Sequence, residues 1–217
     1  MCLAKIEKLK NYIGHAIRQV DLIRRRVIQG EKIPHNDKIF SIFEPHTEWI
    51  SKGKAGVPQE LGLRVCILED QYGFILHHHV MEKQTDDKVA VAMVDAARYK
   101  FPNLRRCSFD KGFYSPANKK ELRNKLDVLV LPKKGKLNKI EREEETAEIF
   151  VQSKRKHSAV ESAINGLENH GLDRCPDHGP LGFKRYVSLA VLARNFQIIG
   201  HHIQQKELKR TQRRKAA

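Results

Sequence analysis

Two acidic residues are placed where a carboxylate could hold a metal ion. Asp110 follows the predicted strand 104–109, which breaks into Lys111 and Gly112, so a rigid strand would hold its carboxylate while leaving it open to solvent. Carboxylate oxygens, together with phosphate oxygens, are the ligands that Mg²⁺ prefers. Glu161 could supply a second carboxylate. A plainer interpretation of Asp110 is an aspartate that forms a turn.

Glu161 lies on one side of a predicted helix over residues 153–168. Its polar stripe consists of His157, Glu161, Asn165 and Glu168, at the spacing that places residues on one helix face. One acidic side chain of this stripe could reach the same ion as Asp110. The alternative interpretation is a solvated helix face.

Basic residues surround these two positions. The chain has 41 Lys and Arg against 26 Asp and Glu, a formal charge of +15 and a pI near 9.8, which favours a polyanionic partner. Basic clusters lie at residues 133–139, 154–156 and 206–215. They are typical of phosphate-backbone binding, although the last could be a disordered, solubilising end.

Two other groups could suggest a metal site. In His77-His78-His79 neighbouring side chains of a strand point to opposite faces, so at most two could share an ion. Cys175 and His178 form a C-x-x-H pair, but a structural zinc site needs four well-spaced ligands. The four cysteines form no CxxC pair, which indicates free thiols in a reducing compartment.

The elements that must position Asp110 and Glu161 follow from the apolar patterns. An amphipathic basic helix is predicted over 3–28, ended by Gly30, and a loop over 53–58. Strands 61–69 and 74–80 flank a turn at 70–73, and a helix capped at Thr85 precedes Pro102. The remaining predicted elements are strand 104–109, a helix from Ser115, strand 127–131, helices 141–150, 153–168 and 183–203, and a basic tail.

This order predicts an α/β domain with a mixed sheet, whose hairpin is antiparallel and whose later strands are added through helical crossovers. Ligands gather at strand ends in such sheets. We expect three regions: an amphipathic basic helix over 1–30, this α/β domain over 31–204 and a basic tail over 205–217. Without an apolar run long enough for a spanning helix or a signal peptide, a cytoplasmic protein is expected.

Four stretches resemble insertion-sequence transposases of the DDE type, whose catalytic domain has the RNase H-like fold. They are IFSIFEPHTEWISKGKAG from Ile39, SFDKGFYSPANKKEL from Ser108, KRKHSAVESAINGLENHGLDRCPDHG from Lys154 and FKRYVSLAVLARN from Phe183. The pairing of Asp-Lys-Gly-Phe-Tyr-Ser after a strand with a Glu in a basic helix about fifty residues later is the most specific part of the resemblance.

The resemblance implies that Asp110 and Glu161 are the second and third acidic residues of a catalytic triad. In that family the triad holds two divalent ions, Mg²⁺ or Mn²⁺, for nicking at the element's ends and strand transfer to target DNA. DNA contacts are then expected from Lys111, Lys133, Lys134, Lys136, Lys154, Arg155, Lys156 and His157. The complete enzyme would be a homo-oligomer without membrane attachment.

Two departures from the family pattern affect these expectations. The positions four before and seven after the catalytic Glu often hold Arg and Lys, but here hold His157 and Glu168. No aspartate fits the first triad position, since Asp21, Asp37 and Asp70 are predicted outside the required strand. We therefore expect an N-terminally truncated domain without its first strand, with little or no strand-transfer activity by itself.

Two other functions stay open. The chain could be a non-catalytic nucleic-acid-binding protein whose acidic residues are structural. It could also be an RNase H-like nuclease or resolvase, which shares the site but acts on other substrates.

Overall fold

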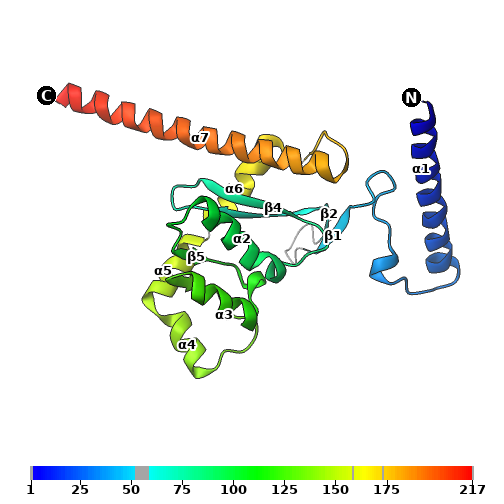
Figure 1. The fold of residues 1–217 in the computed structure, drawn as a ribbon, viewed down its shortest axis with the longest axis horizontal. Coiled ribbons are helices and arrows are strands. Elements are labelled where there is room, and N and C mark those ends of the chain that lie inside the picture. The colour runs from blue at the N-terminus through cyan, green and yellow to red at the C-terminus, as the bar shows by residue number, and fades with distance from the viewer. Residues whose placement is uncertain (1, 52–58, 158, 173, 217) are drawn as a thin grey trace. The chain divides into compact units, whose positions relative to one another are not determined.

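The computed structural model describes residues 2–51, 59–157, 159–172 and 174–216. Within these ranges, the side chains of residues 2, 156–162, 170 and 215–216 are not described. The chain forms two compact units, one of Met1–Arg64 with His178–Pro180 and the other of Val65–Asp177 with Leu181–Ala217. Figure 1 shows the elements of both units.

A long N-terminal helix dominates the first unit. Helix α1 (Cys2–Ile23) continues into the π-helical turn η1 (Arg24–Ile28), and Gly30 follows in a left-handed conformation with φ 68°. The predicted helix over 3–28 is thus confirmed. Leu22 is buried, and Tyr12 lies edge-on to Phe43 with ring centroids 5.5 Å apart.

The first unit also contains a short turn, η2 (His35–Asp37), and a two-stranded antiparallel sheet. Strand β1 (Glu48–Ser51) pairs with β2 (Gln59–Gly62) so that Glu48 lies opposite Gly62. Strand β1 was not predicted, and the predicted strand 61–69 is two strands, because β2 ends at Gly62 and glycine weakens a strand interior. The predicted loop at 53–58 lies outside the described residues.

A hairpin opens the second unit, as predicted. Strands β3 (Arg64–Glu69) and β4 (Ile75–Met81) pair across a turn in which the Gly73 amide donates to the Asp70 carbonyl at 3.1 Å. The Asp70 Oδ1 atom accepts from the amides of Tyr72 and Phe74. Asp70 is therefore a turn-forming aspartate.

Helix α2 (Asp86–Lys100) links the two main hydrophobic clusters of this unit. Towards the hairpin it contributes Val89, Met93 and Ala97, which pack with Cys66, Leu68 and Met81. With Ala90 and Val94 it also joins a second cluster, completed by Phe109, Leu122, Leu126 and Leu131. This helix is thus the element around which the unit is built.

The second cluster supports a parallel pair of strands. Strand β5 (Arg106–Ser108) pairs with β6 (Val128–Val130), and helix α3 (Pro116–Lys125) is the crossover between them. The mixed α/β class is confirmed. Among the described residues, however, the strands form three two-stranded sheets rather than one mixed sheet, and side-chain packing on α2, not backbone hydrogen bonding, connects β3–β4 with β5–β6.

The rest of the second unit is helical. Its elements are α4 (Lys139–Thr146), α5 (Glu148–His157), α6 (Ala159–Leu167), the π-helical η4 (Glu168–Leu172) and α7 (Gly179–Ala216). Asn195 of α7 bonds both backbone groups of Ile75 on β4, at 2.9 and 3.0 Å.

Helix boundaries differ from the predictions in several places. The single helix predicted over 153–168 is divided between α5 and α6, and α7 begins at Gly179, before the predicted start at 183. Helix α7 continues past the predicted end at Ile203, because the Gln, Lys, Glu and Arg residues that follow are good helix formers. The helix predicted over 141–150 is interrupted at Ala147, whose ψ of 140° is not helical. No helix in the described part of the chain is long and apolar enough to cross a membrane.

Candidate active site

Asp110 lies directly after the parallel strand pair. The amide of the buried Phe109 donates to the Val130 carbonyl at 2.8 Å, which extends the pairing of β5 with β6 up to Asp110. The Asp110 side chain is exposed, and its Oδ1 accepts from the Lys111 amide at 2.7 Å, capping the 3₁₀ turn η3 (Lys111–Phe113). Only Oδ1 takes part in this cap, so Oδ2 can still ligate a cation.

A buried asparagine supports the turn that follows Asp110. Asn118, in the first turn of α3, is 9% exposed, and its Nδ2 donates to the carbonyls of Phe113 at 2.9 Å and Asp87 at 2.6 Å. It thereby ties η3 to the first turn of α2. We did not predict this role, although a polar residue three places after Ser115, in a Ser-Pro helix start, was a signal available in the sequence.

The first residue of α2 approaches the same turn. A Cβ atom added at Gly112 would collide with the Asp86 carboxylate, so this glycine permits close contact between η3 and α2. From the loop after β6, Lys134 Nζ donates to the Gly112 carbonyl at 3.1 Å. The turn after Asp110 is therefore bordered by a second carboxylate and by a lysine from another segment.

Glu161 belongs to α6, but its side chain lies outside the described residues. The position of the helix is set by packing: Ala163 and Leu167 are buried, and a Cβ atom added at Gly166 would lie 3.0 Å from Cζ and Nε of Arg194 on α7. The proximity of Glu161 to Asp110 stays a prediction.

The donor chemistry at Asp110 fits a hard divalent cation. Mg²⁺ is commonly held by one or two carboxylates together with phosphate oxygens and water, and Asp110 offers an exposed carboxylate at a rigid strand end. Among the residues whose side chains are described, no group of three or more His, Cys, Asp or Glu could hold a metal ion.

The expected DNA contacts fall into three groups. Lys111, Lys134 and Lys136 are exposed around η3 and the loop after β6. Lys154 and Arg155 are exposed on α5. The side chains of Lys156 and His157 lie outside the described residues.

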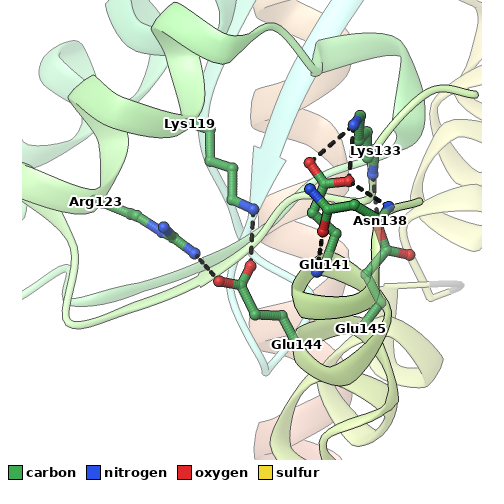
Figure 2. Close-up of polar contacts among 7 residues, drawn as sticks. All are labelled: Lys119, Arg123, Lys133, Asn138, Glu141, Glu144 and Glu145. Carbon is green, nitrogen blue, oxygen red and sulfur yellow. Dashed lines mark hydrogen bonds and ion pairs between the residues drawn. The ribbon is translucent and has the colours of Figure 1, made fainter. Parts of the chain in front are cut away.

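Lys133 differs from its neighbour Lys134 because its charge is paired. Its Nζ contacts both carboxylate oxygens of Glu141, at 2.7 and 2.8 Å, and its amide donates to Glu145. Figure 2 shows this contact together with the capping box of Asn138 and Glu141. The hydrogen bond from Lys133 lowers the pKa of Glu141 and raises that of Lys133.

A second ion-pair cluster in Figure 2 fastens α4 to α3. Glu144 accepts from Lys119 at 2.8 Å and from Arg123 at 2.9 Å. The hydrogen bond from Lys119 is the main reason that the pKa of Glu144 is lowered. These ion pairs neutralise basic side chains of α3 and of the loop after β6. Only some of the lysines and arginines are therefore available to bind a polyanion.

The histidine and cysteine motifs make ordinary polar contacts. His78 Nε2 lies 3.1 Å from Ser188 Oγ, and His79 Nε2 lies 2.8 Å from Gln84 Oε1. His178 Nδ1 lies 3.1 Å from Glu44 Oε1, whereas Cys175 Sγ donates to the Asp177 carbonyl.

Comparison with known proteins identifies the family of the chain. The family model described as "Transposase DDE domain" matches residues 30–196, which include β1 to β6, Asp110, α6 and the N-terminal part of α7. No significant match was found among curated proteins or solved structures. Since the matched segment makes up most of the 217 residues and contains Asp110 at the end of its parallel strand pair, the chain belongs to the DDE transposase family.

Proposed function

We propose that this chain is the DNA-cleaving and strand-transfer part of an insertion-sequence transposase, and that it works with divalent metal ions held by Asp110 and Glu161. The substrates would be the element's own ends and a target DNA. The complete protein would act as a homo-oligomer in the cytoplasm.

The geometry around Asp110 carries this proposal. Its carboxylate follows the last hydrogen bond of the parallel strand pair, and Asn118 anchors the turn behind it. Lys111 is exposed next to it, and Lys134 reaches the same turn. A carboxylate flanked by lysines on a rigid support can bind a cation and attract a phosphate diester together.

The residues of the chain would divide the work as follows. The bound ions would supply activation of water or of a DNA 3′ hydroxyl and charge neutralisation at the leaving oxygen. Asp110 and Glu161 would hold the ions in place. Lys111 and Lys134 would attract the scissile phosphate and offset its charge.

Metal binding by the purified chain tests the assignment of Asp110. Mn²⁺ affinity is measured by electron paramagnetic resonance for the native chain and for Asp110→Asn, which keeps the capping oxygen but removes the charge. Because even changes outside the ligand shell cost about 10–100-fold in metal affinity, we expect at least about a tenfold loss. Asp127→Asn is the control, since Asp127 is an exposed aspartate paired only loosely with Arg105 at 3.8 Å.

Glu161→Gln should lower the Mn²⁺ affinity as well, with Glu168→Gln on the same helical segment as its control. Unchanged affinity in both Asp110→Asn and Glu161→Gln would refute the proposed site. Nicking of supercoiled plasmid in Mn²⁺ is the second measurement, and we expect it to be weak in the isolated chain because no first triad aspartate is identified.

A non-catalytic DNA-binding protein is the second candidate, favoured by the capping role of Asp110. If capping is its whole purpose, Asp110→Asn preserves DNA affinity, Mn²⁺ affinity and stability together. In the enzyme, the same substitution lowers Mn²⁺ affinity and leaves stability unchanged.

The adjacent lysines offer a matched test of DNA binding. Lys134→Gln should weaken binding to any duplex and reduce the salt dependence by about one counterion, because an exposed cation at the turn after Asp110 is lost. Lys133→Gln should have a smaller effect on the salt dependence, because Glu141 already pairs that charge. Equal effects would contradict the proposed path of the DNA.

A further inference from the structure

Two polar residues of α7 contact the segment that carries Glu161. Helix α6 continues into η4, and this segment approaches α7 at two glycines. A Cβ atom added at Gly166 would lie 3.0 Å from Nε of Arg194. One added at Gly171 would lie 2.7 Å from the hydroxyl oxygen of Tyr186. The absence of a side chain at both positions therefore lets α7 reach the backbone of this segment.

The contact of Tyr186 is a hydrogen bond to the end of the segment. Its hydroxyl donates to the Gly171 carbonyl at 2.9 Å, and the side chain is half-buried. Gly171 has φ 93°, a conformation that favours glycine, and it lies in the π-helical turn η4. Tyr186 thus fixes η4 at a turn whose backbone conformation other residues adopt only with strain.

Arg194 touches α6 and also acts on the hairpin of the same unit. Its Nη1 donates to Gln197 Oε1 at 2.8 Å, and its Nε, next to Gly166, is buried without a hydrogen-bond partner among the described residues. Burial raises the pKa of Glu69, the last residue of β3, and the positive charge of Arg194 lowers it. The guanidinium group therefore lies between α6 and a carboxylate at the end of the hairpin strand.

Both contacts come from one face of α7. Tyr186 and Arg194 are eight residues apart, and the buried Ala190 lies midway between them. Residues at i, i+4 and i+8 lie on the same side of a helix. Glu161 lies five residues before Gly166 on α6, a rise of roughly 7 to 8 Å along the helix. The position of the Glu161 backbone in this unit therefore depends on that face of α7.

We propose that Tyr186 and Arg194 are positioning residues, which fix α6 and η4 on α7 and thereby set where Glu161 meets its metal ion. Neither side chain touches the ion or the DNA. A ligand has to be held within about 0.5 Å of its productive position, so the contacts that hold its helix affect the affinity for the ion. This inference rests on the proposed role of Glu161.

Mn²⁺ affinity of the full chain, measured by electron paramagnetic resonance, tests the two residues separately. Tyr186→Phe removes only the hydroxyl group, and Arg194→Met removes the charge while keeping a long side chain. We expect each to lower the affinity by about tenfold, with unchanged circular dichroism. The matched controls are Tyr72→Phe and Arg142→Met, since both residues are exposed. Neither control should change the affinity.

Hydrogen exchange provides a measurement without metal. The amides of residues 163–172 should exchange faster in Tyr186→Phe and in Arg194→Met than in the native chain, because α6 and η4 are less firmly held. The two controls should leave this exchange unchanged. Unchanged exchange in both test variants would overturn the proposal.

Double variants separate positioning from a general loss of stability. If Arg194 acts through Glu161, Arg194→Met should have little further effect on Mn²⁺ affinity in the Glu161→Gln chain. An equal loss with and without Glu161→Gln would overturn the proposal, as would a loss in Glu161→Gln that neither Tyr186→Phe nor Arg194→Met reproduces. In that last case the metal site itself still stands. If Glu161→Gln leaves the affinity unchanged, the metal site fails and the positioning proposal fails with it.

Discussion

Replacing Asn118 by alanine should destabilise the second unit and loosen the turn behind Asp110. The side chain is 9% exposed, and both of its bonds come from Nδ2, to the carbonyls of Asp87 and Phe113. No water can easily replace these bonds at a site so enclosed. The substitution therefore removes two hydrogen bonds and leaves their acceptors unsatisfied.

The magnitude follows from the two bonds. A typical bond contributes about 0.5–1.5 kcal/mol net, and a buried group left without its partner costs about 1–3 kcal/mol. For two acceptors in partly buried surroundings we expect a loss of about 2–4 kcal/mol in the free energy of unfolding. In a chain of this length that corresponds to a Tm lower by about 5–10 °C.

Urea unfolding followed by circular dichroism measures this loss in the full chain. Asn124→Ala is the control on the same helix, because Asn124 is exposed and alanine is the better helix former, so its stability should be unchanged or slightly higher. The functional consequence is a lower Mn²⁺ affinity in Asn118→Ala, since Asp110 is less well positioned. An Asn118→Ala chain within about 0.5 kcal/mol of the native one would refute the reasoning, because substitutions that break no such contact fall in that range.

Three further predictions concern other parts of the second unit. Cys66 is buried, and burial raises its pKa to about 12, so iodoacetamide at pH 8 should alkylate the more exposed Cys175 in the folded chain and Cys66 only after unfolding. Peptide mass spectrometry measures the labelling, and equal labelling of these two cysteines would contradict the burial of Cys66. Glu144→Gln should cost up to about 1 kcal/mol at pH 7, because the lost ion pairs are partly exposed. The pKa of Glu144 is lowered from 4.5, so the difference in stability between the native chain and this variant should be present above pH 4.5 and disappear as the pH falls below it. Unfolding curves at several pH values measure this difference. Asn195→Ala should lower the free energy of unfolding by about 1–3 kcal/mol, because both backbone groups of the buried Ile75 lose their partner. Gln204→Ala, on the exposed part of α7, should leave it unchanged. Equal melting curves for the two variants would show that water replaces the Asn195 amide.

Local patterns were sufficient to predict most elements of the fold. The hairpin around Asp70 and the helix that begins at Ser115-Pro116 depend on turn and capping residues within a few positions of one another. The helix after Thr85 begins where predicted, although the Thr85 side chain makes no capping hydrogen bond. The N-terminal helix and its end near Gly30 follow in the same way from an amphipathic pattern and a glycine, which has a positive φ in the structure. Such interactions are short in range, so a single sequence contains them in full.

Pairings between distant segments were predicted less well. Strand β1 escaped prediction because the residues that pair with it are on β2, and its own four residues are too few for a clear alternation. The division of the strands into two-stranded sheets depends on the packing of α2 between hydrophobic clusters. The continuation of α7 to Ala216 was missed because a run of charges suggests a tail, although those residues are good helix formers.

By itself the sequence determined that the chain is basic, that it has a mixed α/β fold and that Asp110 follows a strand in a DDE transposase domain. Only the tertiary structure decided which residues surround that aspartate: Asn118 from α3, Asp86 from α2 and Lys134 from the loop after β6. It also distinguishes the two neighbouring lysines: Lys134 contacts the turn after Asp110, whereas Lys133 forms an ion pair with Glu141. The composition of a chain sets how many charges it carries. The partner of each charge depends on the packing of the core, because that packing decides which distant segments come within hydrogen-bonding distance.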